Sequence, residues 1–208
     1  MAWVVCETTP EHLNNYSLTI KMTSTTQTPN ELLQIQGKDH LHIGGKEARE
    51  GWKLLNIQAA AGVDYVGDIR DLSQFPDASF DAIYGSHVLE HVGYQKALGD
   101  VLKSIHRILR PGGKFLVSVP DLDVLCRLFV HEQMTANDRF FMMQMMFGGQ
   151  TDEHDFHYVG LNAEFLSQYL QQAGFREVYR VSEFGIFDDT SSMRYQGALI
   201  SLNLVAIK

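Results

Sequence analysis

The sequence of 208 residues predicts an α/β fold: a mostly parallel sheet, doubly wound by helices, with an antiparallel strand at its C-terminal edge. From Glu31 onward, short apolar runs bounded by Gly, Pro or Asp alternate with segments of helical periodicity. Residues 80–119 place a strand, a helix and a strand in succession, which requires a crossover and therefore parallel pairing. The closing run, 198–206, alternates apolar and polar positions, which is typical of a half-buried strand.

Strands are expected where short β-prone runs end in turn-forming residues: 41–43, 53–57, 63–66, 80–84, 114–119, 175–181 and 198–206. The strongest helix is expected over 97–109, with Arg107 and Arg110 in its last turn. The Pro-Gly-Gly run at 111–113 cannot continue this helix and turns the chain into the next strand. Further helices are expected over 122–131, 137–147 and 162–173.

Residues 1–30 differ from the rest and are interpreted as an N-terminal extension and linker, followed by one domain over 31–208. The extension carries two β-prone runs, 3–6 and 16–22, and a Ser/Thr-rich segment. A chain of this length can bury about 70% of its surface, which is enough for a single core.

Composition excludes several classes of protein. Seventeen Lys and Arg against 25 Asp and Glu give a net charge of −8, which argues against a nucleic-acid partner. No apolar run reaches the roughly 18 residues of a membrane span, and no signal peptide is evident, so no membrane partner is expected. Cys6 and Cys126 lie far apart with no CxxC pattern, so we expect no disulfide and a cytoplasmic location.

Four segments carry a resemblance to a known family: 63–72 (VDYVGDIRDL), 75–84 (FPDASFDAIY), 86–91 (SHVLEH) and 109–121 (LRPGGKFLVSVPD). In this order they resemble the class I, Rossmann-like methyltransferases that use S-adenosylmethionine, in particular a small subgroup with a shortened and degenerate first cofactor loop. The resemblance implies S-adenosylmethionine as cofactor. It also implies methyl transfer to a small polar acceptor, such as a sugar or a cell-surface precursor.

The same resemblance implies which residues hold the cofactor: Gly44, Gly45, Asn56, Asp68, Ile69, Ser86 and His87. Asp68, at the end of a strand, can accept a hydrogen bond from the adenine amino group, and Ile69 can line the ring. Alternatively, Asp68 only caps a helix or forms an Asx turn. Ser86 and His87 end the fourth strand, at the sheet edge where ligands bind in parallel α/β sheets.

Three residues depart from the family pattern. His42 stands where the family has an acid, Lys46 where it has a second glycine, and Asn56 where an acid grips the ribose hydroxyls. Because a charge-assisted hydrogen bond contributes about 1.5–3 kcal/mol and a neutral one about 0.5–1.5, Asn56 is expected to weaken binding about tenfold. Lys46 is expected to offset part of this loss by meeting the cofactor's carboxylate. These departures favour, as an alternative, a methyltransferase-like domain that no longer catalyses and serves as a binding or scaffold module.

The connection between the first two strands is short. Only about nine residues, 44–52, join them, whereas a parallel crossover usually takes about a dozen or more. Either the first helix is one turn long, or the first strand begins elsewhere.

Histidines are the candidate catalytic residues, because imidazole is a suitable base near neutral pH. We expect His91 or His87 to take the acceptor's proton, with His157 third, and Asp121 as an alternative that orients the acceptor. Residues 87–91 also match the inverted zinc-protease motif H-x-x-E-H, which puts both histidines on one side of a helix. The surrounding segments favour the methyltransferase interpretation and no bound metal. A zinc hydrolase that uses His87, Glu90 and His91 is the third alternative.

Two further segments leave alternatives open. Within 150–157, His154 and His157 either bind a metal, flank an acceptor or are simply solvated. The Met/Phe-rich run 140–147 is apolar nearly all round, which favours burial in the core or a homodimer contact over a substrate lid.

Overall fold

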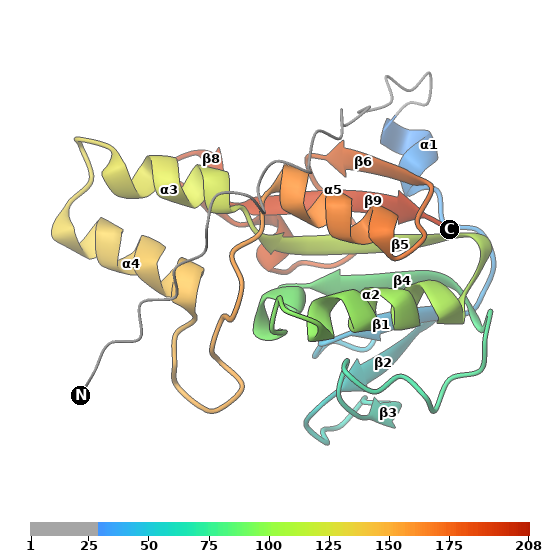
Figure 1. Ribbon diagram of the computed structural model, residues 1–208. Helices are drawn as coiled ribbons and strands as arrows, with labels where there is room; N and C mark the ends of the chain where they lie inside the picture. Colours follow the sequence, from blue (N-terminus) through green and yellow to red (C-terminus); the bar gives the residue numbers. More distant parts are fainter. Residues whose placement is uncertain (1–28) are drawn as a thin grey trace.

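The computed structural model describes residues 29–208, which form a seven-stranded sheet (Figure 1). Its order is β3-β2-β1-β4-β5-β9-β6. The strands are β1 (His40–Ile43), β2 (Trp52–Asn56), β3 (Tyr65–Val66), β4 (Phe80–Ser86), β5 (Leu109–Pro120), β6 (Glu177–Val181) and β9 (Ser201–Ile207). Strands β1 to β5 are parallel, and β9 pairs antiparallel with both β5 and β6. The predicted α/β class and the antiparallel direction of the last strand are confirmed.

The C-terminal end of the sheet differs from the prediction in two details. The last strand lies one place in from the edge, and β6 takes the outermost position. The run predicted as one strand over 198–206 is divided at Ile200, because the Ile200 amide donates to the carbonyl of Met193 and leaves the ladder. Ala198–Leu199 (β8) instead pairs with Arg194–Tyr195 (β7) in a separate two-stranded sheet.

One face of the sheet is covered by two helices, α2 (Ala97–Ile108) and α5 (Ala163–Gln172) (Figure 1). Their apolar sides pack on inward-facing strand residues to form the larger hydrophobic core. The helix predicted over 97–109 ends at Ile108, so Arg110 lies outside its last turn. Its guanidinium instead pairs with Asp39 and Asp81, at 2.8 and 2.7 Å.

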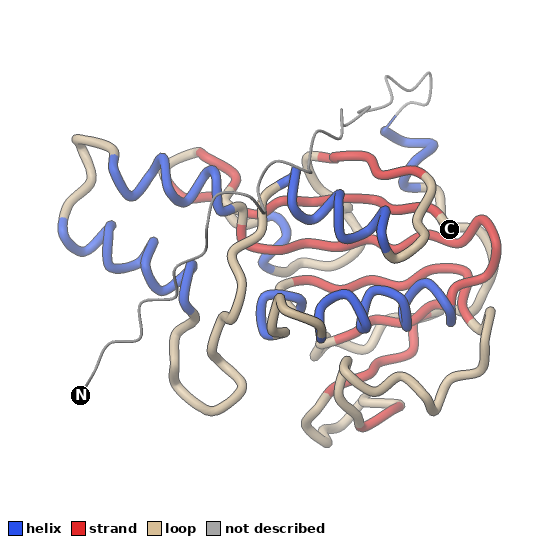
Figure 2. The backbone as a smooth tube through the Cα atoms, in the orientation of Figure 1, coloured by secondary structure: helices blue, strands red, loops and turns tan. Residues whose placement is uncertain are grey.

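Within residues 29–208, the opposite face has little helical cover, which is the main departure from a doubly wound sheet. The connection between β1 and β2, residues 44–51, is a loop without a helix (Figure 2), so neither explanation considered for its shortness applies. The short helix α1 (Pro29–Leu33) and the segment 184–187 pack there, against Trp52 and Tyr84. Segments distant in sequence therefore bury the surface that a first helix would otherwise cover.

His42 belongs to this second core. Its ring centroid lies 4.1 Å from that of Phe187 and 5.0 Å from that of Tyr84, and the side chain is buried. The residue that replaces the family acid therefore contributes to packing on the sheet face formed by Trp52, Tyr84 and Phe187.

Helices α3 (Leu122–Val130) and α4 (Ala136–Phe147) form a lobe that projects beyond the carboxyl end of β5 (Figure 1). They contact each other and share a small core around Met142. Phe140 and Phe147 are more than half exposed. Core burial, one of the two alternatives favoured for the run 140–147, is therefore wrong for these two residues, and the homodimer contact stays a prediction; within residues 29–208, α4 packs mainly on α3.

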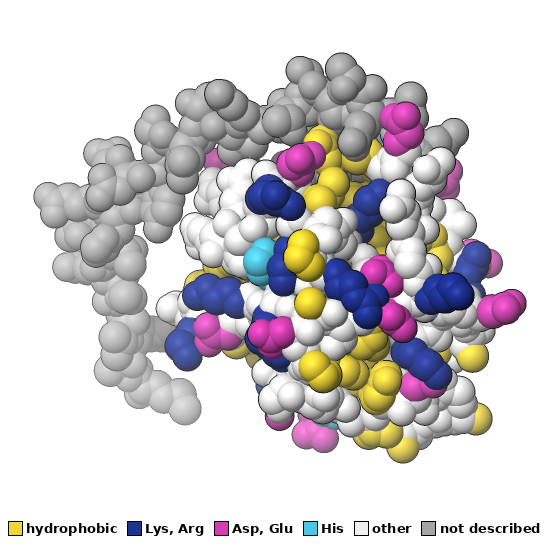
Figure 3. Space-filling model, turned by 90° about the vertical axis from the view of Figure 1, so that its right-hand side faces the viewer, with side chains coloured by type: hydrophobic (Ala, Val, Ile, Leu, Met, Phe, Trp, Pro, Cys, Tyr) yellow, Lys and Arg dark blue, Asp and Glu magenta, His cyan; other side chains and the backbone are white. Residues whose placement is uncertain are grey.

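Among residues 29–208, no helix is both long and apolar enough to cross a bilayer. On the face shown in Figure 3, basic and acidic side chains are interspersed. Cys126 is an exposed free thiol, and Cys6 lies outside the described residues, as do the predicted strands 3–6 and 16–22.

Replacing His42 by Phe should make the protein less sensitive to acid. Burial lowers the pKa of His42 from 6.5 to about 4, an effect that the nearby Asp189 carboxylate partly opposes. Between these values the unfolded chain binds a proton that the folded chain does not, so the free energy of unfolding falls as the pH falls through this window. When the pH falls from 7 to 4.5, the free energy of unfolding should therefore fall by about 2 kcal/mol less in His42→Phe than in the parent protein.

Urea unfolding at the two pH values measures this difference. The exposed His154→Ala variant is the control and should keep the parent's pH dependence. An unchanged dependence in His42→Phe would show that His42 is protonated within the fold.

Candidate functional site

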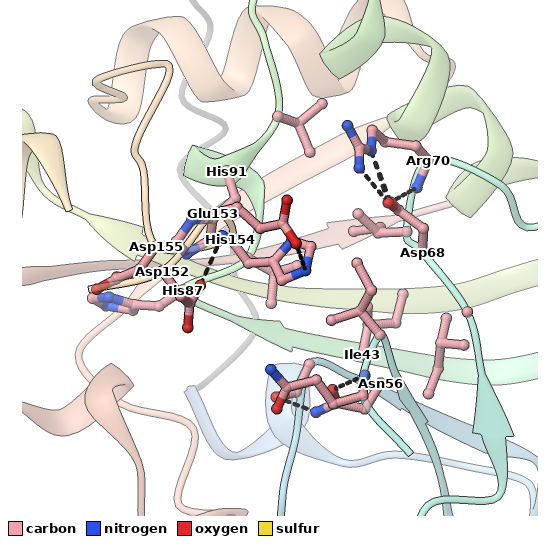
Figure 4. A pocket seen from close by; sticks show the side chains of 18 of the residues that line it. Ile43, Asn56, Asp68, Arg70, His87, His91, Asp152, Glu153, His154 and Asp155 are labelled. Atoms are coloured by element: carbon pink, nitrogen blue, oxygen red, sulfur yellow. Dashed lines mark hydrogen bonds and ion pairs between the residues drawn. The ribbon is translucent and has the colours of Figure 1, made fainter. Parts of the chain in front are cut away.

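A cleft of about 520 Å³ lies at the carboxyl ends of β1, β2, β3 and β4 (Figure 4). Here the sheet order reverses: the chain proceeds from β1 outward to β3 and then returns to β4 on the other side of β1. Loops after neighbouring strands diverge at such a point and leave a crevice. Ile43, Asn56 and Asp68 lie on the strand-end side of the cleft, and a loop containing 151–155 lies opposite.

Gly44 forms the floor of the cleft. Its φ of +80° lies in the left-handed region, and its amide donates to the carbonyl of Leu55 at 2.8 Å. A Cβ at this position would stand 2.6 Å from Cγ2 of Val88, in the turn that follows β4. Only glycine fits this close approach without strain. The predicted glycine thus lets the loop after β1 pack closely on the turn after β4 where both border the cleft.

Asn56 stabilises the first loop. Its side-chain amide donates to the carbonyl of Gly45 at 2.9 Å, and its carbonyl oxygen accepts from the amide of Gln58 at 2.9 Å. The residue that replaces the family's ribose-binding acid therefore ties the loops after β1 and β2 together while lining the cleft. Lys46 also lines the cleft.

Asp68 and Ile69 follow β3 in the chain and line the cleft. Oδ1 of Asp68 accepts from the backbone amide of Arg70 at 2.8 Å, which is the Asx turn considered as the simpler interpretation. The Arg70 side chain also pairs with this carboxylate, with Nε 2.9 Å from Oδ2, and holds the pKa of Asp68 below its usual value. Four hydrogen bonds from Arg70 already fill the roughly four acceptor positions of this carboxylate, so a ligand contacts it only if the Arg70 side chain releases one of them.

Two of the predicted cofactor residues do not line this cleft. A Cβ on Gly45 would stand 2.3 Å from the His42 ring, so this glycine makes room for His42. The Ser86 hydroxyl lies 3.3 Å from that of Thr190, next to the segment that packs on Tyr84. Because successive side chains of a strand point to opposite faces, Ser86 is directed to the aromatic side of the sheet.

His87 lines the cleft, but both of its ring nitrogens have neighbours. The Ser201 hydroxyl donates to the carbonyl of Thr190 at 2.7 Å, so Nε2 of His87 must donate to that hydroxyl, at 2.9 Å. Nδ1 then carries the lone pair, 3.5 Å from Oε1 of Glu90. Burial lowers the pKa of His87 to about 4, so the ring is neutral at pH 7 and poorly placed to act as a base.

Glu90 is a functional candidate that the sequence interpretation considered only as part of the zinc motif. Its side chain is buried, and neither carboxylate oxygen has a hydrogen-bond partner. Burial raises the pKa of Glu90 to about 8. A buried carboxyl group without partners is rare and marks a functional candidate.

His91 and His157 lie face to edge, with ring centroids 4.8 Å apart. Nδ1 of His91 donates to the carbonyl of Phe156 at 3.1 Å, and Nδ1 of His157 donates to the carbonyl of Met145 at 3.1 Å. These bonds place a proton on Nδ1 of each ring and leave Nε2 as the atom available to a ligand. The structure brings His91 and His157 together although 66 positions separate them in the sequence.

The two histidines open onto a second cleft of about 350 Å³. Its other walls come from Phe141, Gln144 and Met145 of α4 and from Asp155. His87 and His91 line both clefts and therefore mark the junction between the two.

The loop at 151–155 borders the first cleft. From the sequence, simple solvation is one of the interpretations of this segment. Asp152, Glu153, His154 and Asp155 all line it (Figure 4). Asp155 is anchored by the amide and hydroxyl of Thr151, and this hydrogen bond holds its pKa below the usual value. No sequence motif predicts that these acids lie near the strand ends, because only the tertiary fold brings residues 151–155 next to them.

The geometry does not support the helical zinc motif. Residues 89–91 form a single turn of 3-10 helix (Leu89–His91), and His87 has a φ of +52° outside it. Since a shared helix face requires a regular helix, the argument from their spacing is wrong here. Asp121, the alternative for orienting an acceptor, is the N-cap of α3 and pairs with Arg180 at 2.7 Å.

Comparison with known proteins gives the same result at the level of family and fold. A family model described as a methyltransferase domain matches residues 45–117. The chain is 32% identical over 109 residues to a probable S-adenosylmethionine-dependent methyltransferase of Mycolicibacterium smegmatis, covering 52% of this chain and 33% of that protein. It is 35% identical over 80 residues to the ubiquinone/menaquinone biosynthesis C-methyltransferase UbiE of Pseudoalteromonas translucida, covering 37% and 31%.

The chain thus spans about a third of the length of these curated relatives (33% and 31%). A solved SAM-dependent methyltransferase from Archaeoglobus fulgidus has a TM-score of 0.52 and 16% identity over 84% of this chain and 88% of that one. These matches confirm the predicted resemblance and the Rossmann-like fold, with S-adenosylmethionine as the cofactor of the family.

Replacing Gly44 by Ala should destabilise the protein through two separable effects. A non-glycine residue at positive φ costs about 1–3 kcal/mol, and the new Cβ also contacts Val88. In a Val88→Ala background the contact disappears and only the backbone term remains. Urea unfolding of the parent, the two single variants and the double variant should therefore give a coupling free energy of about 1 kcal/mol or more. Purely additive effects would show that the loop after β1 does not press on the turn after β4.

Proposed function

We propose that this chain, which a methyltransferase-domain model matches over residues 45–117, is a class I S-adenosylmethionine-dependent methyltransferase that transfers the methyl group of that cofactor to a small polar acceptor. The observation that carries the proposal is the cleft at the place where the strand order reverses, between the ends of β1 and β4, which Gly44 and Asp68 line. A sugar or cell-surface precursor with a free hydroxyl or amine is the acceptor class that we propose to test first.

The residues of the cleft fit an adenosyl group. The cleft has a volume of about 520 Å³, within the range of about 300–1,000 Å³ that is typical of small-molecule sites. Ile43, Leu55 and Ile69 supply apolar contacts for a purine ring. The Asp68 carboxylate can accept from the adenine amino group, and Asn56 can offer a neutral hydrogen bond to the ribose hydroxyls.

The acidic loop supplies charge that the first loop lacks. His42 and Asn56 remove two carboxylates that the family places near its positively charged cofactor. Asp152, Glu153 and Asp155 line the facing wall, so negative charge is present on the other side of the cleft. Charges of opposite sign in a cleft attract a ligand and hold it in orientation. Lys46 also lines the cleft and, in this proposal, meets the cofactor's carboxylate.

When bound, S-adenosylmethionine supplies an activated methyl group, which forms a bond to the acceptor's lone pair while the C–S bond breaks and its electron pair stays on sulfur. The chain mainly aligns the acceptor with this group. Nε2 of His91, at the junction of the two clefts, takes the proton that a hydroxyl or amine acceptor releases. His157 lies beside it and presents a second lone pair.

The second cleft is the proposed acceptor site. It combines apolar walls at Phe141 and Met145 with polar groups at Gln144 and Asp155. Because it meets the first cleft at His91, an acceptor held there faces the cofactor site and the base together. In this proposal α4 forms part of the acceptor site, a role similar to that of the substrate lid considered from the sequence for 140–147.

Calorimetric titration with S-adenosylmethionine and S-adenosylhomocysteine tests the proposal against its main alternative. A methyltransferase should bind both, whereas a scaffold module that has lost catalysis need bind neither. No heat of binding with either ligand, from protein shown to be folded by circular dichroism, would favour the scaffold interpretation.

Asp68→Asn should lower the affinity for S-adenosylhomocysteine about tenfold. The variant replaces a charge-assisted hydrogen bond with a neutral one, a difference of about 1–1.5 kcal/mol. Asp71→Asn is the matched control, because Asp71 forms a similar turn with Ser73 but does not line the cleft. Equal losses in the two variants would show that the effect arises from the loop's stability.

His91→Ala should lower the turnover number by a factor of about 10²–10⁴ while the dissociation constant for S-adenosylmethionine changes little. The base acts on the acceptor's proton and contributes little to binding of the cofactor. Release of S-adenosylhomocysteine in the presence of hydroxyl-bearing sugars measures turnover, and calorimetry measures affinity. His154→Ala, which removes a histidine from the same cleft, is the control. A parallel fall in both constants would contradict a role as base.

A further inference from the structure

We propose that Glu90, His91 and His157 form a binding site for one divalent transition-metal ion of the zinc class. One ligand atom from each of the three side chains lies within 4.8 Å of the other two. Ligands at about 2.0–2.2 Å from a zinc ion stand roughly 3.4 Å apart in a tetrahedron, so side-chain movements of about 1 Å complete the site. This set differs from the sequence motif, because His157 replaces His87.

The two histidines are already oriented as ligands. A backbone carbonyl can only accept, so the bonds from His91 to Phe156 and from His157 to Met145 place the proton on Nδ1 of each ring. Nε2 is then the free donor atom in both. Histidines that bind metals are typically held in this way, with the second nitrogen donating to a carbonyl or carboxylate.

Glu90 supplies an independent observation. The residue is 1% exposed, and both of its carboxylate oxygens are buried without a hydrogen-bond partner. An unsatisfied buried polar group costs about 1–3 kcal/mol, and more if it is charged. Coordination to a cation would satisfy this carboxylate, which has an oxygen within 4.8 Å of a ring nitrogen of each histidine.

The donor set indicates which ions fit. Two imidazole nitrogens and one carboxylate oxygen suit zinc and neighbouring transition metals, whereas magnesium and calcium prefer sites built from oxygen. Three protein ligands leave at least one coordination position free, as in catalytic zinc sites. Phe141 and Gln144 of α4 line the cleft on which Glu90, His91 and His157 open, so an acceptor bound there can reach the free position.

The consequence for catalysis rests on the proposed function. An acceptor hydroxyl bound to the ion would release its proton to the surrounding water more readily, because a bound cation stabilises the alkoxide. Activation of the acceptor would then pass from the His91 imidazole to the ion, and His91 would act as a ligand. Both descriptions place the reacting oxygen at the junction of the two clefts.

A competing interpretation gives Glu90 a structural part only. A protonated Glu90 can donate to the lone pair on Nδ1 of His87, although the 3.5 Å separation is long for this bond. The conservative variant Glu90→Gln separates the two interpretations. Its amide keeps the size and the donor of the protonated acid but loses the carboxylate that a cation requires.

The test is titration of the full chain with Co²⁺, a spectroscopic probe for such sites, and with Zn²⁺ in competition. We expect one equivalent of Co²⁺ to bind, with visible absorption bands that zinc displaces. Glu90→Gln and His157→Ala should each weaken binding at least 100-fold. Two matched controls, Glu153→Gln and His154→Ala, remove the same groups from the neighbouring loop and should bind as the parent does. Circular dichroism confirms that each variant is folded.

Several results would overturn the inference: no saturable binding by the parent chain, equal losses in the control variants, or unchanged affinity in Glu90→Gln. Should Glu90→Gln fail to fold, His157→Ala decides alone. S-adenosylhomocysteine titrations on the same samples keep the two proposals separate. Cofactor binding without metal binding refutes only the metal site, and metal binding without cofactor binding refutes only the methyltransferase function.

Discussion

The parallel pairing of β4 with both β1 and β5 is the constraint on which the rest of the structure depends. The register places Ile43 beside Gly85 on one side and Ser86 beside Ser118 on the other, so the carboxyl ends of all three strands reach the same edge. The chain changes direction across the sheet at β1 and β4, and the following loops separate. Gly44, the turn at Val88 and the histidines meet there because of this pairing.

The shortened connection after β1 has two effects on one face of the sheet. Without a first helix, the face at Trp52 and Tyr84 is covered by the chain around Phe187, which comes from the far end of the sequence. The same change explains His42. On a face packed with aromatic rings, a neutral imidazole contributes to the core, whereas a carboxylate there would be buried without a partner.

The buried groups around Glu90 set the chemistry of the junction between the clefts. His87 is held by Ser201, while His91 and His157 are held by backbone carbonyls, so three imidazoles with different surroundings meet one carboxyl group. The surroundings of the three imidazoles separate their roles: His87 is held through Nε2 with its Nδ1 facing Glu90, whereas His91 and His157 are each held through Nδ1. The acidic loop 151–155 then closes the opposite wall of the first cleft.

Local pattern was sufficient for much of the fold. Periodicity predicted α2 and α5 to within a few residues, and the strand–helix–strand order from β4 to β5 established the parallel sheet and the edge at which Gly44, Asp68 and His91 lie. The pairing of His91 with His157, the isolation of Glu90 and the approach of the acidic loop depended on tertiary structure. Hydrophobic period and turn chemistry act over a few residues, whereas burial and contacts between distant segments exist only once the chain has packed.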